Sequence, residues 1–204
     1  MLFNDSYNQI DSGGIGLYKE LGSKFIAYAF LVYNKKEVEQ SLGQVKKKEK
    51  SANHYCYAYV LNPDYSSFKF NDDGEPVSTA GKPILTQIRK HHLTNILIVV
   101  VRYFGGKKLG IPGLIRAYKN ATLDAIQKST IINKKLKEQY QIRFSHNEMN
   151  YVMSVIKKYN LEVFNSEFKD INIITINLLQ KDSDIILSIF KKNRNLEIRY
   201  KKIV

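Results

Sequence analysis

The sequence predicts an α+β protein of two domains, each an α/β sandwich. Three observations predict this class. The 204 residues are enough for two small domains, strand-like and helix-like apolar periodicities alternate along the chain, and the alternation restarts after the lysine-rich residues 134–137. We therefore expect one domain at residues 1–135 and another at residues 136–204, joined near residues 133–138.

The first part of the chain begins with a strand pair and a helix. Residues 17–33 predict two strands, because apolar side chains alternate with other residues around Phe25. Asn34 is expected to cap a helix, with Glu37 three residues later at the spacing of a capping box. Residues 54–61 then predict another strand.

Two helices and one buried strand complete the first domain. Ser78 or Thr79 is expected to cap a helix that has Pro83 in its first turn. The uninterrupted apolar run 95–101 predicts a buried strand, and Pro112 opens a further helix. We expect all three helices of this domain, including the one capped by Asn34, to lie on one face of the sheet.

The second part of the chain repeats the alternation in a different order. From residue 140 the apolar spacing predicts strand, helix, strand, strand, helix and strand, at residues 140–144, 149–156, 161–163, 174–178, 185–189 and 196–200. This βαββαβ order is that of the split ferredoxin-like unit.

A split signature flanks the buried strand of the first domain. Its first half contains Asp72-Asp73-Gly74-Glu75-Pro76 and Thr79-Ala80-Gly81-Lys82-Pro83. Its second half is Arg102-Tyr103-Phe104-Gly105-Gly106-Lys107-Lys108-Leu109-Gly110. Acids, glycines and one arginine thus gather at the ends of one strand, where α/β proteins commonly build sites.

These motifs, with residues 112–118, resemble the YigZ/IMPACT family. The resemblance extends to Ser23-Lys24-Phe25 and to residues 54–58, so it covers most of residues 16–130. It implies a bacterial YigZ-like member, with a first domain similar to those of a small-subunit ribosomal protein and elongation factor G, and a ferredoxin-like second domain similar to one in the same factor. The family pattern commonly has glycine where this chain has Ser78.

The resemblance gives less help with function. Eukaryotic members of the family regulate translation by competing for a ribosome-associated activator of a starvation-sensing initiation-factor kinase. Bacterial YigZ-like members have no settled biochemical activity.

The glycine-rich half of the signature predicts an anion site at the start of a helix. Glycines allow close backbone approach, and a helix start presents free N–H groups. The alternative is that the glycines only turn the chain tightly. The residues expected to bind an anion or nucleic acid are Arg102, Gly105, Gly106, Lys107, Lys108, Gly110 and Arg116.

The acidic half of the signature is expected to organise its own loop. Arg102 ends an apolar strand, so we expect it to pair with Asp72, Asp73 or Glu75. Those carboxylates have the alternative roles of Mg²⁺ ligands or acid–base groups, but consecutive aspartates diverge and the segment also has turn chemistry. We assign no catalytic residue, no metal ligand and no cofactor.

Two further groups of side chains have alternative roles in the first domain. His54 and Cys56 share a strand face, which allows a nucleophile pair, although a lone cysteine among tyrosines more often packs as a small hydrophobe. The tyrosines of residues 55–59, with Tyr103 and Phe104, either stack on exposed bases or fill a core.

Composition suggests where the protein acts and on what. The net charge of +13 and pI near 9.6 suggest a polyanionic partner; the alternative is a compositional bias toward lysine. One cysteine excludes an internal disulfide, and we expect a cytoplasmic protein because neither a signal peptide nor a bilayer-spanning run is evident.

The leading hypothesis is a non-enzymatic translation-associated regulator that binds RNA, the ribosome or a ribosome-bound protein. The alternative is an enzyme that acts on a small phosphorylated or nucleotide substrate in a groove between residues 72–81 and 102–113.

Overall fold

The computed structural model describes residues 5–204, which form two compact units. One unit comprises residues 7–134, and the other comprises residues 135–204 with residues 5–6. Residues 133–138, where we expect the two domains to join, are the end of one strand and the start of the next, separated by Leu136. The lysines that interrupt the apolar pattern therefore stand on strands.

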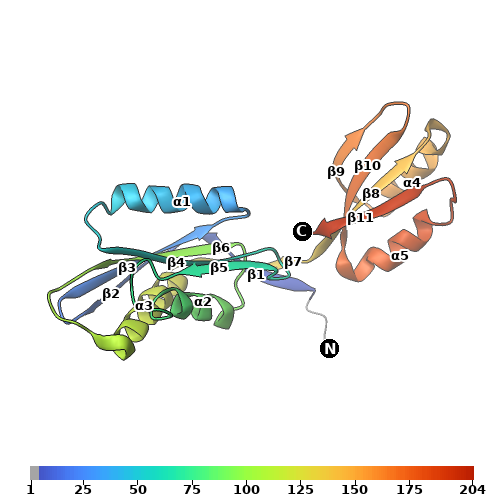
Figure 1. The fold of residues 1–204 in the computed structure, drawn as a ribbon. Helices are drawn as coiled ribbons and strands as arrows, with labels where there is room; N and C mark the ends of the chain where they lie inside the picture. Colours follow the sequence, from blue (N-terminus) through green and yellow to red (C-terminus); the bar gives the residue numbers. More distant parts are fainter. Residues whose placement is uncertain (1–4) are drawn as a thin grey trace. The chain divides into compact units, whose positions relative to one another are not determined.

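A five-stranded antiparallel sheet forms the centre of the first unit (Figure 1). Its strands, in order across the sheet, are β2 (Ile15–Glu20), β3 (Ser23–Leu31), β6 (Ile96–Tyr103), β4 (His54–Leu61) and β5 (Ser67–Asn71).

Helices cover both faces of this sheet, so the expectation of helices on one face was wrong. Helix α1 (Lys35–Lys48) lies on one face, and α2 (Gly81–Lys90) and α3 (Gly110–Gln127) lie on the other (Figure 1). Alternate residues of β6 enter two separate cores: Ile98 packs in the core of α2 and α3, and Val99 in the core of α1. An uninterrupted apolar strand requires cover on both sides.

The helix starts show which local signals were sufficient. Asn34 caps α1 as predicted, because its Oδ1 accepts the Glu37 N–H at 3.0 Å. The predicted cap of α2 was wrong: Ala80 occupies the cap position and offers no side-chain hydrogen bond. A distant carboxylate, that of Asp72, accepts the N–H groups there instead.

Two strands form a separate small sheet in this part of the chain. β1 (Ser6–Ser12) pairs with β7 (Thr130–Lys135), and the Ser12 hydroxyl donates to the Thr130 hydroxyl at 2.9 Å. Neither strand was predicted from the sequence.

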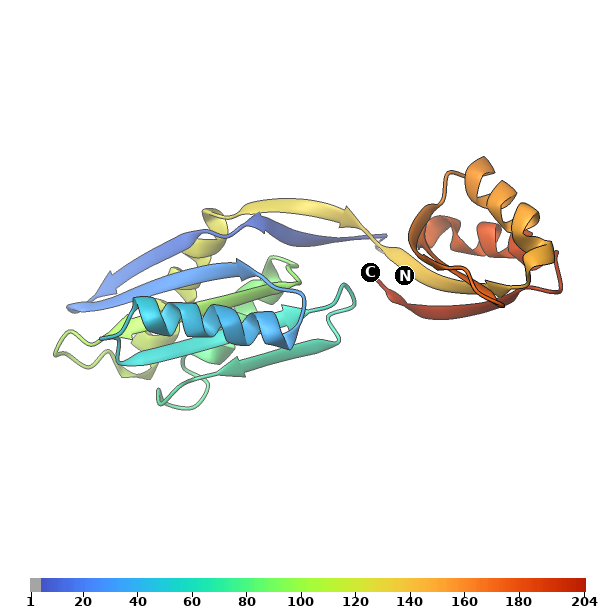
Figure 2. The same ribbon diagram turned by 90° about the horizontal axis from the view of Figure 1, so that it is seen from above.

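The second unit has the predicted order of elements. These are β8 (Lys137–Phe144), α4 (Met149–Lys158), β9 (Glu162–Glu167), β10 (Asn172–Leu179), α5 (Gln180–Phe190) and β11 (Glu197–Ile203), with a short 3₁₀ turn at His146–Glu148. The sheet order is β11-β8-β10-β9, and both helices pack on one face of that sheet (Figure 2). Within residues 5–204 no helix is long and apolar enough to cross a membrane.

Candidate functional site

The two halves of the signature meet in a buried ion pair. Arg102, near the end of β6, donates from Nη1 to Oε1 of Glu75 at 2.7 Å. Only 6% of Arg102 and 8% of Glu75 is exposed. The guanidinium therefore lies inside the unit rather than on an open basic edge.

Helix α3 contributes a third member of this cluster. The Tyr118 hydroxyl, fully buried, donates to the same Glu75 oxygen at 2.9 Å. The Cys56 thiol lies 3.3 Å from the Tyr118 hydroxyl and donates to the backbone carbonyl of Asp72 at 3.0 Å. Burial raises the pKa of the Cys56 thiol and the pKa of the Tyr118 hydroxyl well above their ordinary values. Both groups therefore stay protonated, which does not suit a thiolate nucleophile.

Asp72 acts on the backbone of its own loop. Its Oδ2 accepts the N–H of Ser78 at 2.9 Å, and its Oδ1 accepts the N–H groups of Ala80 and Gly81 at 3.0 and 2.8 Å. Three donors thus surround one carboxylate and fix the loop that leads into α2. Ser78 has a positive φ of 64°, the conformation for which glycine is better suited.

Asp73 joins the same loop to β4. Its Oδ2 accepts the Tyr55 N–H at 2.7 Å, and its carbonyl lies 2.8 Å from Nδ1 of His54. The other ring nitrogen of His54 is 4.0 Å from Glu75 Oε1. The three acids of the signature therefore all contact neighbouring groups of the unit. No group of three or more His, Cys, Asp or Glu in residues 5–204 is arranged to hold a metal ion.

The glycine turn is shaped by close backbone packing. A Cβ on Gly105 would lie 1.9 Å from the carbonyl carbon of Gly22, and the Gly105 N–H donates to Ser23 Oγ at 3.1 Å. Gly106 and Gly110 have positive φ values of 85° and 70°. Gly105 is therefore explained by packing against the β2–β3 turn, and the other two by backbone conformation.

The predicted cations of this region divide into three environments. Lys107 and Lys108 are exposed at the turn before α3, whose start has no side-chain cap and no acid in its first turn. Arg116 is exposed but forms an ion pair with Glu20. Arg102 is buried. Of these predicted cations, Lys107 and Lys108 are exposed without an ion pair among the described residues, and they lie beside the exposed glycines Gly105, Gly106 and Gly110.

The tyrosines near the signature pack beneath α1, and sequence reasoning missed their partner. Glu49, at the end of α1, accepts hydrogen bonds from the hydroxyls of Tyr28 and Tyr103, and its carbonyl accepts one from Tyr55. These side chains are at least half-covered in the α1 core, so they do not form an open stacking platform. The signal available in the sequence was a glutamate at the end of a helix, in a domain whose strands contain several tyrosines that could donate to it.

The fold and the site together define an α+β protein whose most distinctive residues hold its own loops in place. The chain belongs to the IMPACT family: the model of the Impact N-terminal domain matches residues 21–126. This confirms the resemblance on which the family was first assigned.

Relatives and one solved structure agree with this assignment. IMPACT family member YvyE of Bacillus subtilis is 36% identical, over 72% of this chain and 64% of that protein. An IMPACT family member of Haemophilus influenzae is 32% identical over 72% of each protein, and YigZ of Escherichia coli is 33% identical over 61% and 62%. A crystal structure of a hypothetical protein has the same overall fold, with a TM-score of 0.76 over 97% of this chain and 98% of that one, at 23% identity.

The chain spans slightly less than two thirds of YvyE and of YigZ. Activities of those whole proteins are therefore not transferred to it by similarity alone.

Proposed function

We propose that this protein is a non-enzymatic, translation-associated factor that binds RNA phosphates through the turn before α3. The observation that carries the proposal is the internal pairing of the signature. Glu75, Arg102 and Tyr118 bond to one another in the interior, whereas Lys107 and Lys108 are exposed. Because the buried groups hydrogen-bond to one another, their role is to hold the surrounding loops in place. The exposed lysines give the surface of the turn its positive charge.

The start of α3 has the features of an anion-binding helix terminus. The first turn of α3 contains no acid, and no side chain caps its N–H groups. Gly106 and Gly110 have positive φ values, which let the chain turn tightly just before the helix. A phosphate there would gain both backbone donors and the charge of Lys107 and Lys108.

The setting in translation is supported by fold and family. The second unit has four antiparallel strands in the order fourth, first, third, second, with both helices on one face, and this arrangement supports our assignment of a ferredoxin-like fold. We assign the first unit to the ribosomal-protein and elongation-factor-G type. The resemblance to the YigZ/IMPACT family implies that its eukaryotic members act in translational control, and we carry this setting over to the present chain by analogy.

The enzymatic alternative receives less support. A groove does lie near the expected place, with residues 77–79 on one side and Ile111 on the other. Its lining contains no Asp, Glu, His or Cys, so the only titratable groups are Lys82 and Lys119. General acid–base chemistry on a phosphorylated substrate would lack its usual carboxylate or histidine.

Co-sedimentation with ribosomes and polysomes at two salt concentrations tests the proposal, with fluorescence anisotropy on a single-stranded RNA of mixed sequence. Lys107→Ala/Lys108→Ala should weaken association at every sequence tested and reduce the salt slope by about two. The matched control is Lys35→Ala/Lys36→Ala, which removes the same charge from exposed residues of α1 on the other sheet face. Equal slopes for wild type and both double variants would reject the turn as a phosphate site.

A further inference from the structure

We propose that the groove between α2 and α3 binds an acidic amphipathic helix of a protein partner. The groove has a volume of about 430 Å³. One wall is formed by residues 82–87 of α2 with residues 77–79 of the loop before it, and the other by residues 111–119 of α3. Lys107 and Lys108, to which RNA binding was assigned, do not line this groove; the lining residue nearest to them in the chain is Ile111, in the first turn of α3.

The groove exposes apolar side chains from both walls. Val77 is 89% exposed, the largest exposed fraction among the exposed large hydrophobic residues of the described chain. Ile111 and Ile115, 57% and 39% exposed, are four residues apart and so lie on one side of α3. Three aliphatic side chains open to water beside a concave surface favour burial against apolar groups of a partner.

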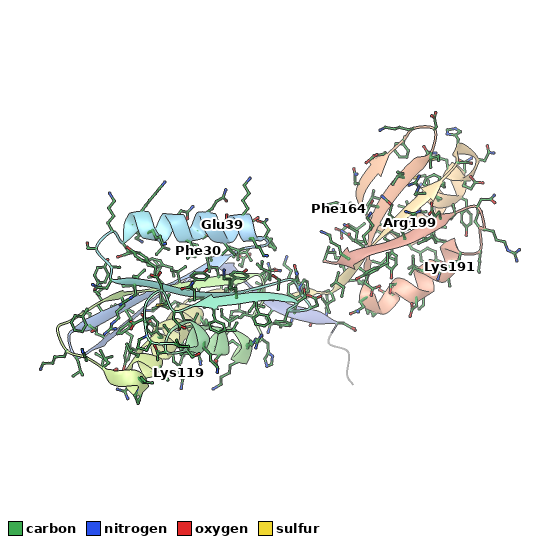
Figure 3. The ribbon with its side chains drawn as sticks, in the orientation of Figure 1. Phe30, Glu39, Lys119, Phe164, Lys191 and Arg199 are labelled. Atoms are coloured by element: carbon green, nitrogen blue, oxygen red, sulfur yellow. The ribbon has the colours of Figure 1, made fainter. Side chains whose placement is uncertain are left out.

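The rim of the groove is positively charged. Lys82 comes from the first turn of α2 and Lys119 from the third turn of α3, and both line the groove. Figure 3 shows Lys119 on the side of α3 that is turned away from the sheet. Neither lysine forms an ion pair with the described residues, and no carboxylate lines the groove. Charge complementarity therefore calls for an acidic partner.

The signature holds the two walls in place. Asp72 fixes residues 78–81 through three backbone N–H groups, and this fixes the loop that carries Val77. Glu75, in the same loop, accepts the Tyr118 hydroxyl from α3. The loop and α3 are thus linked by a buried hydrogen bond. The two walls therefore lose little conformational freedom when a partner binds.

The side chains discriminate among possible occupants. Nucleic-acid phosphates would gain nothing from Val77, Ile111 and Ile115, and a second copy placed symmetrically would bring Lys82 and Lys119 near their own equivalents. A helix with apolar residues at i, i+3, i+4 and i+7 can bury them against the three aliphatic side chains of the groove. Carboxylates beside those residues can pair with the two lysines of the rim.

Fluorescence anisotropy tests this with the intact protein and two labelled 16-residue peptides. One carries leucines at i, i+3, i+4 and i+7 with glutamates at the remaining exposed positions, and the other has lysines in place of the glutamates. We expect saturable binding of the acidic peptide only. Ile115→Asn should weaken it about tenfold, whereas Ile185→Asn, at an exposed isoleucine of the second unit, should not.

Charge reversal is the second measurement, and it does not disturb the interior. Lys82→Glu/Lys119→Glu should abolish binding of the acidic peptide and allow the lysine peptide to bind, while Lys35→Glu/Lys36→Glu should do neither. Lys107→Ala/Lys108→Ala should leave peptide binding intact, which separates this inference from the RNA proposal.

Absence of acidic-peptide binding, or equal binding by wild type and the groove variants, would overturn the inference. Displacement of the peptide by the single-stranded RNA would also overturn it, as would dimerisation in sedimentation equilibrium that is lost in Ile115→Asn.

Discussion

At the scale of single residues, the ion pair of Arg102 and Glu75 is better suited to positioning than to net stabilisation. The Arg102 guanidinium lies 5.5 Å from the ring centre of Phe25 and 5.4 Å from that of Phe104, and its Nε has no hydrogen-bond partner among the described residues. A buried pair often costs as much in desolvation as it gains in attraction, but removal of one partner leaves an uncompensated charge. The pair therefore enforces one loop arrangement.

Arg102→Ala should lower the free energy of unfolding by about 3 kcal/mol, because Glu75 would remain buried without its cation. Urea denaturation monitors the change. Arg102→Ala/Glu75→Gln should recover part of the loss, since the neutral amide oxygen can still accept from Tyr118. An unchanged denaturation midpoint in Arg102→Ala, combined with lost RNA binding, would instead make Arg102 a ligand contact.

The tyrosines around Glu49 make the stability of the first unit depend on pH in the alkaline range. The hydrogen bond to Glu49, with burial, raises the pKa of Tyr103 to about 12, whereas a tyrosine in the unfolded chain titrates near its ordinary value of about 10. A raised pKa in the folded state means that this stabilisation is complete below pH of about 10 and is lost as the pH rises toward 12.

We therefore expect the urea midpoint of Tyr103→Phe to fall less steeply between pH 9 and 11 than that of the wild type. Tyr159→Phe, at an exposed tyrosine of the second unit, serves as the control for the loss of a tyrosine hydroxyl. Identical slopes for all three proteins would mean that the hydroxyl of Tyr103 does not titrate with unfolding.

At the scale of elements, local signals predicted what depends on neighbouring residues and failed where the partner is distant. Asn34 and Glu37 were sufficient for the start of α1. The start of α2 depends on Asp72, eight and nine residues before the N–H groups it accepts, and no spacing rule indicates that. Strands β1, β5 and β7 consist mostly of exposed or partly exposed residues, so they carry little of the apolar alternation that reveals a strand.

In the candidate site, too, contacts between residues that are distant in the chain could not be predicted from local patterns. An arginine at the end of an apolar strand predicted a carboxylate partner within the acidic loop, and the structure identifies it as Glu75. Tyr118 has the spacing of an ordinary core residue of α3, so its hydroxyl bond to Glu75 was not predictable from periodicity. The sequence led us to expect a groove between residues 72–81 and 102–113, and only residues 77–79 and Ile111 of the observed lining fall in those ranges. The rest of the lining depends on how α2 and α3 pack, and a strand separates these helices along the chain.

Two glycine substitutions should have opposite effects because their surroundings differ. Gly105→Ala should destabilise the first unit by at least about 2 kcal/mol, since the new Cβ would collide with the backbone of Gly22. Gly43→Ala should stabilise it by about 0.5–1 kcal/mol, because Gly43 lies within α1 and a Cβ there meets no atom within 4 Å. Thermal unfolding distinguishes them, and a stabilised Gly105→Ala would refute the close approach.

At the scale of the whole molecule, net charge is a weak guide to function. The chain carries +13, yet its cations occupy different environments: Arg102 is interior, Arg116 is paired with Glu20, and Lys48 lies over the ring of Tyr28. What matters for binding is the small group of lysines that remain exposed beside a shaped surface. Lys107 and Lys108 at a helix start, and Lys82 and Lys119 at a groove, are the two such groups that we assign to partners.

The division into two units leads to the last prediction, that residues 1–135 fold without residues 136–204. Each unit has its own buried cores, with no residue shared between them. A protein of residues 1–135 should unfold cooperatively with the near-ultraviolet circular dichroism of packed tyrosines. Residues 1–128 should be less stable, because that protein lacks β7 and thereby the partner of β1, including the bond from Ser12 to Thr130. If residues 1–135 were unfolded while the full chain was folded, the two units would be one cooperative domain, and the boundary inferred from the sequence pattern would be wrong.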